Sequence, residues 1–318
     1  MKIVFFGTSA FASAILKDLI FKSFDIVAVV TRPDKPQGRS LQVLASPVKQ
    51  LLLDSHSHIP VYQPQKASTI EFQQVLVSYD ADLFFVVAYG EILKENILDL
   101  PAKGCFNLHA SLLPKYRGAA PIQRCIMDGS SVSGITIIEM VRQMDAGDML
   151  ASVKVDLTKD MNFGDLEAKL LEVSFDLVPK VINNFDYYYK NKIQQDEDQV
   201  TFAAKISPQD SEILWTDEAS VNCNKIRAFS PSPGAWCKVC IGGQWRRLKI
   251  FSSSIIKDVS PLPGSLLPES HKLDVACLNG VLRLEQVQLE GKKIMTGLDF
   301  LRGVAGKLSF NPESSSSS

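Results

Sequence analysis

Short apolar runs alternate with amphipathic stretches through the first part of the chain. Residues 3–6 and 26–30 are rich in β-branched and aromatic side chains, which is typical of strands buried on both faces of a parallel sheet. Between them, residues 11–21 repeat apolar positions at helical spacing. The same alternation predicts further strands at 59–62, 83–88, 105–109 and 134–140, and helices at 47–53, 71–77 and 120–127. We therefore expect an α/β fold with a doubly wound, mostly parallel, Rossmann-like sheet, whose ligands bind beyond the carboxyl ends of the strands.

The pattern changes beyond residue 148. Residues 150–157 alternate as a half-buried strand, residues 166–189 have the spacing of one long helix, and residues 194–199 are polar and acidic, as in a linker. From residue 231 onward, short strands are separated by Gly and Pro turns, and Asn279-Gly280 predicts a two-residue hairpin turn. Residues 298–304 predict a closing helix. This texture is typical of a small antiparallel β-barrel of the OB-like type.

The different sequence patterns of these two parts of the chain predict the domain organisation. We expect a catalytic domain over residues 1–190, a linker over 191–207 and a carboxyl-terminal β-barrel domain over 208–313. The five serines at 314–318 predict a disordered tail.

Composition limits the partners and the compartment. The 318 residues are 46% hydrophobic, enough for one large core or two moderate ones, and the net charge of -1 leaves no global positive field for nucleic acid. The longest apolar runs are too short to cross a membrane, and the apolar run at residues 3–6 is too short for the hydrophobic region of a signal peptide, so we expect a cytoplasmic protein. In that reducing compartment the six cysteines are expected to stay thiols.

One stretch departs from this charge balance. Residues 219–257 contain no Asp or Glu but carry Lys225, Arg227, Lys238, Arg246, Arg247, Lys249 and Lys257. The stretch also contains Trp236 and Trp245, which could stack on bases. A barrel with one basic, aromatic face is a frequent nucleic-acid platform, and a solvated basic face is the equally weighted alternative.

Two short patterns could belong to metal sites. Cys237 and Cys240 have the spacing of half a zinc site, but they lie in a predicted strand, where residues three apart face opposite ways. His56 and His58 have no third ligand nearby in sequence. We expect packing for the cysteines, solvated surface for the histidines, and no metal.

The most informative segment is the predicted strand at 105–109. Residues two apart on a strand project to one side, so Asn107 and His109 would present an amide and an imidazole together near its carboxyl end. Such a pair can stabilise a developing oxyanion and move a proton, although two polar residues closing a strand are the simpler interpretation. Asp145 follows another apolar run and is either a third member of the site or a turn former.

The sequence contains no motif that predicts a nucleotide cofactor. Gly7-Thr8-Ser9 follows the first predicted strand, but the chain has neither the dinucleotide-binding glycine pattern nor a P-loop.

Three motifs, taken in order, resemble the 10-formyltetrahydrofolate-dependent formyltransferases. They are Asn-Leu-His at 107–109, Ser-Leu-Leu-Pro-Lys-Tyr-Arg-Gly at 111–118 and Asp-Ala-Gly-Asp at 145–148. Four further segments, at 31–39, 46–49, 87–90 and 226–236, are similar to the members of this family that act on methionyl-tRNA. The resemblance spans nearly the whole chain.

The resemblance implies an enzyme for translation initiation. It would transfer the formyl group of 10-formyltetrahydrofolate, its co-substrate, to the α-amino group of methionyl initiator tRNA, as a monomer and without a metal. By the same resemblance Asn107, His109 and Asp145 are catalytic, and Ser111, Leu112, Leu113 and Pro114 contact the folate. Asp145 would either keep His109 charged or relay the amine proton through water.

The resemblance also predicts the tRNA contacts. The loop at 33–45 would reach the acceptor end of the tRNA, with Arg39 as its basic contact. After Arg39 relatives often carry lysines, whereas this chain has Ser40-Leu41-Gln42-Val43, so we expect this loop to make fewer phosphate contacts. The barrel would supply the remaining predicted contacts: Lys225, Arg227, Lys238, Arg246, Arg247 and Lys249.

Other functions stay open at this point. A formyltransferase acting on a small amine, such as an amino-sugar nucleotide, would share the same core. A tRNA- or folate-binding protein without turnover and a formyltetrahydrofolate hydrolase are more distant alternatives.

Overall fold

A computed structural model describes residues 1–37, 42–55, 57–257, 262–267, 271–304 and 308–310. The chain divides into two compact units. Unit 1 comprises residues 1–118, 133–155 and 167–202, and unit 2 comprises residues 119–132, 156–166 and 203–318. The domain limits predicted at 190 and 207 remain predictions. Arg39 and the serine tail lie outside the described residues.

Unit 1 is built on a seven-stranded sheet in the order β10-β9-β7-β6-β1-β2-β5. Its strands are β1 (Ile3–Gly7), β2 (Ile26–Val30), β5 (Val61–Tyr62), β6 (Leu83–Val87), β7 (Cys105–His109), β9 (Val132–Glu139) and β10 (Met149–Asp156). Five neighbouring strands of this sheet, β5, β2, β1, β6 and β7, are parallel, and β9 runs antiparallel to β7. The predicted doubly wound, mostly parallel class is confirmed.

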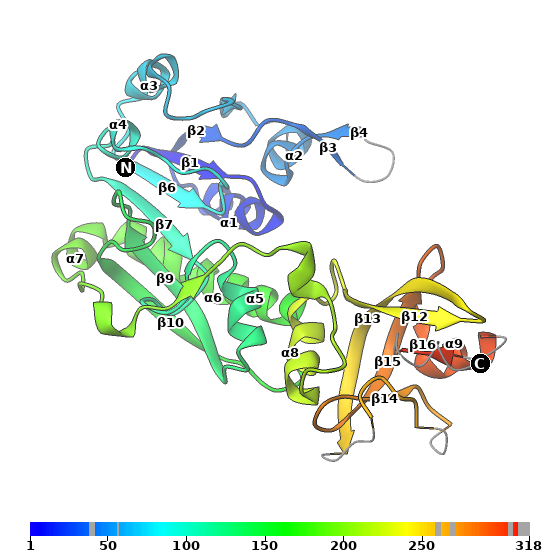
Figure 1. Cartoon of the computed structure of the whole chain (residues 1–318). Coiled ribbons are helices and arrows are strands. Elements are labelled where there is room, and N and C mark those ends of the chain that lie inside the picture. The colour runs from blue at the N-terminus through cyan, green and yellow to red at the C-terminus, as the bar shows by residue number, and fades with distance from the viewer. Residues whose placement is uncertain (38–41, 56, 258–261, 268–270, 305–307, 311–318) are drawn as a thin grey trace. The chain divides into compact units, whose positions relative to one another are not determined.

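The helices of unit 1 follow the predicted alternation with strands (Figure 1). They are α1 (Ala10–Phe21), α2 (Pro47–Asp54), α3 (Ile70–Val77), α4 (Glu95–Leu98), α6 (Phe163–Asn183) and α7 (Phe185–Lys190). Ser9, Ser46 and Thr69 cap α1, α2 and α3, each accepting a hydrogen bond from the backbone N–H three residues on.

The prediction of one helix over 166–189 is wrong in one respect. Asn184 has φ -118° and ψ 35°, which separates α6 from α7. Its side-chain amide donates to the carbonyl of Lys180 at 2.9 Å. An asparagine that bonds its own backbone competes with helix continuation, so the chain bends there.

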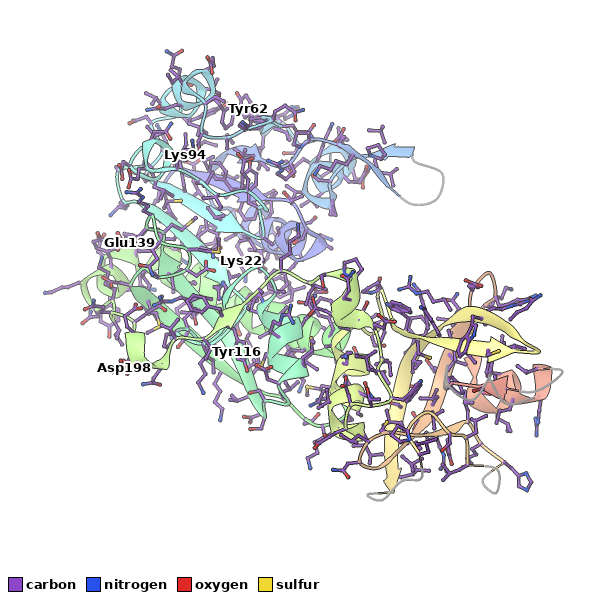
Figure 2. All side chains as sticks on the ribbon, viewed as in Figure 1. Lys22, Tyr62, Lys94, Tyr116, Glu139 and Asp198 are labelled. Carbon is purple, nitrogen blue, oxygen red and sulfur yellow. The ribbon has the colours of Figure 1, made fainter. Side chains whose placement is uncertain are left out.

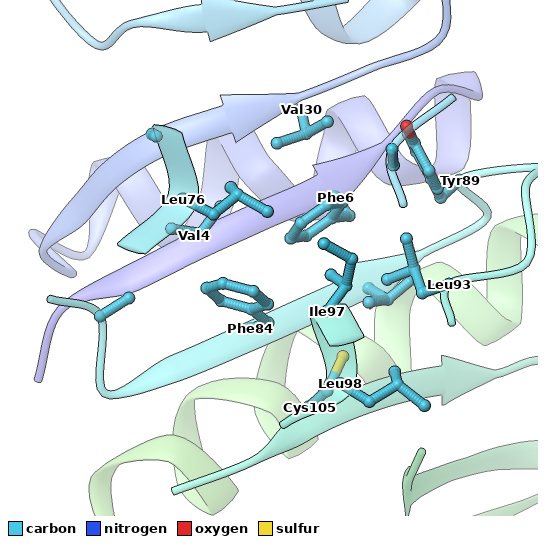
Figure 3. Close-up of a cluster of buried hydrophobic side chains, with 14 of the residues drawn as sticks. Val4, Phe6, Val30, Leu76, Phe84, Tyr89, Leu93, Ile97, Leu98 and Cys105 are labelled. Atoms are coloured by element: carbon cyan, nitrogen blue, oxygen red, sulfur yellow. The ribbon is translucent and has the colours of Figure 1, made fainter. Parts of the chain in front are cut away.

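A buried apolar cluster covers one face of the sheet, as Figure 3 shows. Alternate strand residues, among them Val4, Phe6 and Phe84, point into it and meet Leu76 of α3 and Ile97 of α4. On the opposite face α1 is tied to α6, because the ammonium of Lys22 donates to the carbonyl of Phe175 at 2.6 Å. With both faces covered, the polar groups of the sheet are confined to the strand ends and their loops.

A short hairpin extends from unit 1. It consists of β3 (Lys35–Gln37) and β4 (Gln42–Leu44). Asp34 fixes its base, because the Lys49 ammonium donates to this carboxylate at 2.6 Å and the Gln63 amide donates to it at 2.6 Å. These bonds hold the pKa of Asp34 below its usual value, first through Lys49.

Unit 2 contains a curled antiparallel sheet in the order β14-β15-β13-β12-β17, with β16 paired to β15. Its strands are β12 (Ala235–Ile241), β13 (Gln244–Lys257), β14 (Asp274–Ala276), β15 (Val281–Leu289), β16 (Met295–Thr296) and β17 (Leu308–Ser309). Its helices are α5 (Pro121–Met127), α8 (Ala219–Ala228), α9 (Gly297–Gly303) and the 3₁₀ turn η2 (Pro208–Ser211). Register shifts between β13 and β15 curl the sheet into a half-barrel, which confirms the predicted antiparallel class.

The hairpin turn of unit 2 differs from the prediction. Ala276 pairs with Val281, and the Cys277 N–H donates to the Gly280 carbonyl at 2.9 Å, so the reversal falls on Leu278 and Asn279. Gly280 has φ +88°, whereas Asn279 has no positive φ. The prediction of a two-residue turn on Asn279-Gly280 is therefore wrong, because that type of turn needs a positive φ at both residues.

Several remaining expectations concern cysteines and membranes. All six cysteines are free thiols, and burial raises the pKa of Cys237. Cys237 and Cys240 are both buried in β12. Among the described residues, no group of His, Cys, Asp and Glu is arranged to hold a metal, and no helix is long and apolar enough to span a membrane.

Candidate active site

The centre of the candidate site is the carboxyl end of β7. Asn107 and His109 alternate with buried apolar residues on this strand, in register with Ile138 and Thr136 of β9. The His109 side chain is only 5% exposed, whereas Asn107 is half-buried. Unit 1 therefore places the two groups at one strand end, as the spacing predicts.

Two neighbours determine how His109 is held. Its Nε2 lies 2.9 Å from the carbonyl oxygen of Tyr116, a residue labelled in Figure 2. Because a carbonyl can only accept, Nε2 carries the hydrogen. Its Nδ1 lies 3.6 Å from Oδ2 of Asp145, a distance too long for a hydrogen bond. Nδ1 therefore faces a carboxylate and keeps a hydrogen-bonding position for a reacting group.

Asp145 is held in an unusual conformation. Its φ is +53°, in the left-handed region that few non-glycine residues adopt. Its Oδ2 accepts the Gly118 N–H at 2.8 Å, and its carbonyl accepts the Gln195 amide at 2.7 Å. A Cβ at Gly147 would lie 1.8 Å from the carbonyl oxygen of Glu139, so only glycine fits there. The Asp-Ala-Gly motif thus has a steric reason as well as a chemical one.

The Asn107 amide is the open group of the site. Within the described part of the chain its side chain has no hydrogen-bond partner, in contrast to His109 and Asp145. A half-buried amide without an internal partner can donate to a substrate oxygen and accept from an amine.

The segment predicted to contact folate, residues 111–114, is tightly fixed. The Ser111 hydroxyl donates to the Lys115 carbonyl at 2.6 Å, and the Leu113 N–H donates to Thr136 Oγ1 at 3.2 Å. Thr136 in turn donates to the Ser111 carbonyl at 2.7 Å. Ser111 and Leu113 are buried, while Leu112 and Pro114 are half-buried. The polar groups of Ser111 and the N–H of Leu113 therefore shape the loop, and Leu112 and Pro114 have surface left for a ligand.

Sequence reasoning missed the residues that hold these groups. Thr136, Gln195 and Thr201 all bond to the site loops, and none belongs to a recognisable motif. Gln195 and Thr201 lie in the stretch predicted to be a linker. Only their burial and partners, which a single sequence does not display, mark them as part of the site.

The basic residues of unit 2 divide into two groups. On the hairpin of β12 and β13, Trp236 pairs with Lys249, Lys238 with Arg247, and Cys240 with Trp245. Paired residues share one face of an antiparallel sheet, so the face carries the cations Lys238, Arg247 and Lys249 and both tryptophans. The Arg247 guanidinium lies 4.0 Å from the centre of the Trp236 ring. We call these five residues the hairpin face. Within this face Lys249 is half-buried, and its ammonium donates to the Pro233 carbonyl at 2.6 Å. Arg246 pairs with Val239 on the opposite side and donates to Gln244.

The second group is engaged internally. The Lys225 ammonium donates to the Glu212 carbonyl at 2.8 Å and pairs with Asp217 at 3.4 Å. The Arg227 guanidinium donates to the carbonyls of Thr158 and Met161, and burial lowers its pKa. These two cations hold unit 2 together, although both were predicted as tRNA contacts.

The α/β unit, with its Asn-x-His strand end and Asp-Ala-Gly loop, and the antiparallel second unit fit the formyltransferases that the sequence resembles. The formyl transferase family model matches residues 1–182, and the model of the formyl transferase C-terminal domain matches residues 205–305. The chain belongs to this family, which confirms the resemblance seen in the sequence.

Individual relatives extend over the whole chain. The chain is 45% identical to the methionyl-tRNA formyltransferase of Protochlamydia amoebophila over 307 residues, covering 96% of each chain. It is 43% identical to that of Chlamydia abortus, covering 98% of each. It is 40% identical to that of Brucella anthropi, covering 95% of this chain and 98% of the relative.

Solved structures share the fold at lower identity. The sugar 3N-formyl transferase WlaRD, solved in the presence of dTDP and 5-N-formyl-THF, is 18% identical with a TM-score of 0.63, covering 92% of this chain and 99% of its own. The methionyl-tRNA formyltransferase of Clostridium thermocellum is 18% identical with a TM-score of 0.54, covering 80% and 94%. HypX from Aquifex aeolicus, in complex with tetrahydrofolic acid, is 14% identical with a TM-score of 0.63, covering 96% and 48%.

Proposed function

We propose that this protein transfers the formyl group of 10-formyltetrahydrofolate to the α-amino group of methionyl initiator tRNA. The observation that carries the proposal is the similarity of 39–45% identity to relatives named methionyl-tRNA formyltransferase, which extends across both units. The products are N-formylmethionyl-tRNA and tetrahydrofolate. The protein would act in the cytoplasm as a monomer.

The three polar residues of unit 1 have complementary roles in this reaction. As the methionyl amine attacks the formyl carbon, negative charge develops on the formyl oxygen. The Asn107 amide donates a hydrogen bond to that oxygen, and Nδ1 of His109, which makes no hydrogen bond within the described residues, donates a second. Both hydrogen bonds become stronger as the charge forms, which stabilises the transition state more than the bound substrate and so lowers the barrier.

Asp145 completes the site electrostatically. With Nε2 donating to Tyr116, an Nδ1 that also donates belongs to a charged imidazolium, and the carboxylate 3.6 Å away stabilises that charge. The proton lost by the amine passes to N10 of the folate as the bond between N10 and the formyl carbon breaks. Asp145, the carboxylate that faces His109, can relay this proton through one water.

The surroundings fit a folate. The co-substrate supplies a formyl carbon already activated for attack and a flat aromatic body. Ile92, Val141 and Met144, in the loops that follow β6 and β9, are large apolar residues left exposed. The Arg142 guanidinium lies 3.8 Å from the carboxylate of Glu95, the first residue of α4, so the segments that follow β6 and β9 lie close together. Their exposed apolar residues offer contact to a planar ligand.

The hairpin face fits the tRNA. It gathers three cations and two aromatic rings on one side of β12 and β13. Cations neutralise phosphates and rings stack on bases, so the combination is typical of single-stranded or acceptor-end nucleic acid. The loop that contains Arg39 would add a contact at the acceptor end.

A small-amine acceptor is the second candidate, because structural relatives include sugar formyltransferases. The discriminating experiment offers labelled 10-formyltetrahydrofolate with either methionyl initiator tRNA or a dTDP-linked amino sugar, at equal acceptor concentrations. The proposal expects label in the tRNA fraction that mild base releases as N-formylmethionine. Label in the amino sugar alone would contradict it and assign the protein to the second candidate.

A further inference from the structure

The stretch after α7 makes close contacts with the site. Ile193 exchanges backbone hydrogen bonds with Met149 at 2.8 and 2.9 Å, which seats the stretch beside β10. Further along, the Arg117 N–H donates to the Thr201 carbonyl at 2.9 Å. Residues 193–201 therefore run along the site loops inside unit 1 rather than as a free connector.

Gln195 is buried against the loop that carries Asp145. Its side chain is 4% exposed, and its amide donates to the carbonyls of Asp145 at 2.7 Å and Gly147 at 2.8 Å. Its carbonyl accepts from Nε of Arg117 at 3.0 Å. Both amide hydrogens are used, so the side chain can adopt only one orientation.

Arg117 fixes Gln195 in turn. It is 1% exposed, and its guanidinium donates to both carboxylate oxygens of Glu197, at 2.7 and 3.2 Å. This pairing holds the pKa of Glu197 below its usual value. A buried arginine without such partners is costly, so the bidentate pair and Gln195 keep its orientation fixed.

Thr201 acts on the other partner of His109. Its Oγ1 accepts the Tyr116 N–H at 2.9 Å, and Tyr116 has φ +65°. The carbonyl of Tyr116 accepts from His109. Without the threonine hydroxyl, this strained residue loses the bond to its N–H, while the backbone bond from the Arg117 N–H to the Thr201 carbonyl remains. One short stretch therefore holds both the Asp145 loop and the Tyr116 carbonyl.

We infer that Gln195 and Thr201 are positioning residues for formyl transfer: Gln195, itself held by Arg117 and Glu197, fixes the Asp145 loop, and Thr201 fixes Tyr116, whose carbonyl orients His109. This inference rests on the proposed function. Neither residue touches the reacting atoms. Both act by fixing the relative positions of the His109 imidazole and the Asp145 carboxylate, because displacements near 1 Å in an active site already slow catalysis.

The test uses the full chain and near-isosteric changes. Gln195→Met keeps the volume but removes all three hydrogen bonds, and Thr201→Val removes only the hydroxyl. Thr201→Ser restores the hydroxyl and is the matched control. Rates of initiator methionyl-tRNA formylation are measured per folate-binding site, counted by tetrahydrofolate titration, so that unfolded protein does not contribute.

A positioning role predicts a split between kcat and KM. For Gln195→Met and Thr201→Val we expect kcat to fall about tenfold or more, with both KM values changed less than about twofold, and Thr201→Ser to stay near wild type. A role in folding alone would lower the number of folate-binding sites and leave kcat per site unchanged. That result, or an equal loss in Thr201→Ser and Thr201→Val, overturns the inference even if Gln195→Met does not fold.

The two proposals fail in different ways. If the wild-type protein formylates methionyl-tRNA and the variants match it, only the positioning role is wrong. If the wild-type protein does not formylate methionyl-tRNA, the proposed function is wrong and this inference falls with it.

Discussion

The carboxyl end of β7 and the hairpin face of unit 2 both present polar residues, but they differ in how tightly these residues are held. At the strand end, His109 and Asp145 are held by backbone and side-chain groups at hydrogen-bond distance, and Gly118, Gln195 and Tyr116 supply those groups. On the hairpin face, Lys238, Arg247 and Trp245 are exposed, whereas Lys249 and Trp236 donate to the carbonyls of Pro233 and Pro208.

The difference reflects what each region has to do. Bond formation needs donors fixed before the charge develops, because reorganisation during the reaction raises the barrier. Phosphate binding gains from long, solvated side chains that adapt to the partner, and its energy comes largely from released counterions. The strand end should therefore control kcat, and the hairpin face should control KM and its dependence on salt.

The largest expected effect is on the chemical step. His109→Ala removes one oxyanion donor and should lower kcat by about 100-fold or more, with KM for methionyl-tRNA nearly unchanged. His58→Ala, which removes an exposed histidine of the same unit, is the control. Steady-state kinetics with labelled formyl donor measure both. A loss of similar size in the control would show that the assay does not report on this site.

A smaller effect, of the opposite kind, is expected from the hairpin face. Replacing Lys238 and Arg247 together by Ala should raise KM for methionyl-tRNA about tenfold at low salt and leave kcat unchanged. The slope of log KM against log salt should fall by roughly 0.7–0.9 for each tRNA phosphate that the variant no longer neutralises. The double variant Lys292→Ala with Lys293→Ala removes two exposed cations elsewhere in unit 2. An equal change in this control would show that the hairpin face contributes only to the overall charge of unit 2 and is not a specific tRNA-binding surface.

Arg39 should contribute one phosphate contact at most. Arg39→Ala is expected to reduce tRNA affinity severalfold and to lower the salt slope by roughly 0.7–0.9, with no change in folate binding. Filter-binding titrations at several salt concentrations measure both quantities. If affinity and slope both match those of the wild type, Arg39 does not bind a phosphate.

The smallest effect concerns stability in unit 2. The Arg124 guanidinium, 2.8 Å from Asp210, lowers the pKa of this carboxyl from 3.8 to about 2. A depressed carboxyl pKa stabilises the fold above the unfolded value near 4, and this contribution is lost as pH falls through about 2. Asp210→Asn should therefore cost about 1 kcal/mol at neutral pH and almost nothing near pH 2.

Thermal unfolding of both proteins, measured from neutral pH downward, checks this expectation. The gap between the two Tm values should close as the solution becomes acidic, while kcat and KM at neutral pH match. A gap that is independent of pH would show that the ionisation of Asp210 does not stabilise unit 2.

The spacing of apolar and polar residues predicted most of the helices and strands, because each of them is determined mainly by residues close together in the sequence. The strand at 105–109 is β7 with the same limits, since its apolar residues and flanking glycine act locally. The helix break at Asn184 and the turn at Leu278 depend on single side-chain and backbone bonds, which a hydrophobic pattern does not encode.

The candidate site could be predicted only where motifs carry it. Asn107, His109 and Asp145 stand out because their residue types fit the chemistry. Gln195 and Thr201 sit in a polar stretch with the composition of a linker, and their partners lie 50 and 85 residues away in sequence. Lys225 and Arg227 illustrate the converse, since a basic composition does not reveal that their charges are used inside unit 2.

The most direct test of the account is formyl transfer from labelled 10-formyltetrahydrofolate to methionyl initiator tRNA, measured beside elongator methionyl-tRNA and with His109→Ala. The account predicts labelled N-formylmethionine on the initiator, little on the elongator, and almost none with the variant. Equal labelling by His109→Ala, or no labelling of initiator tRNA by the wild-type protein, would contradict it.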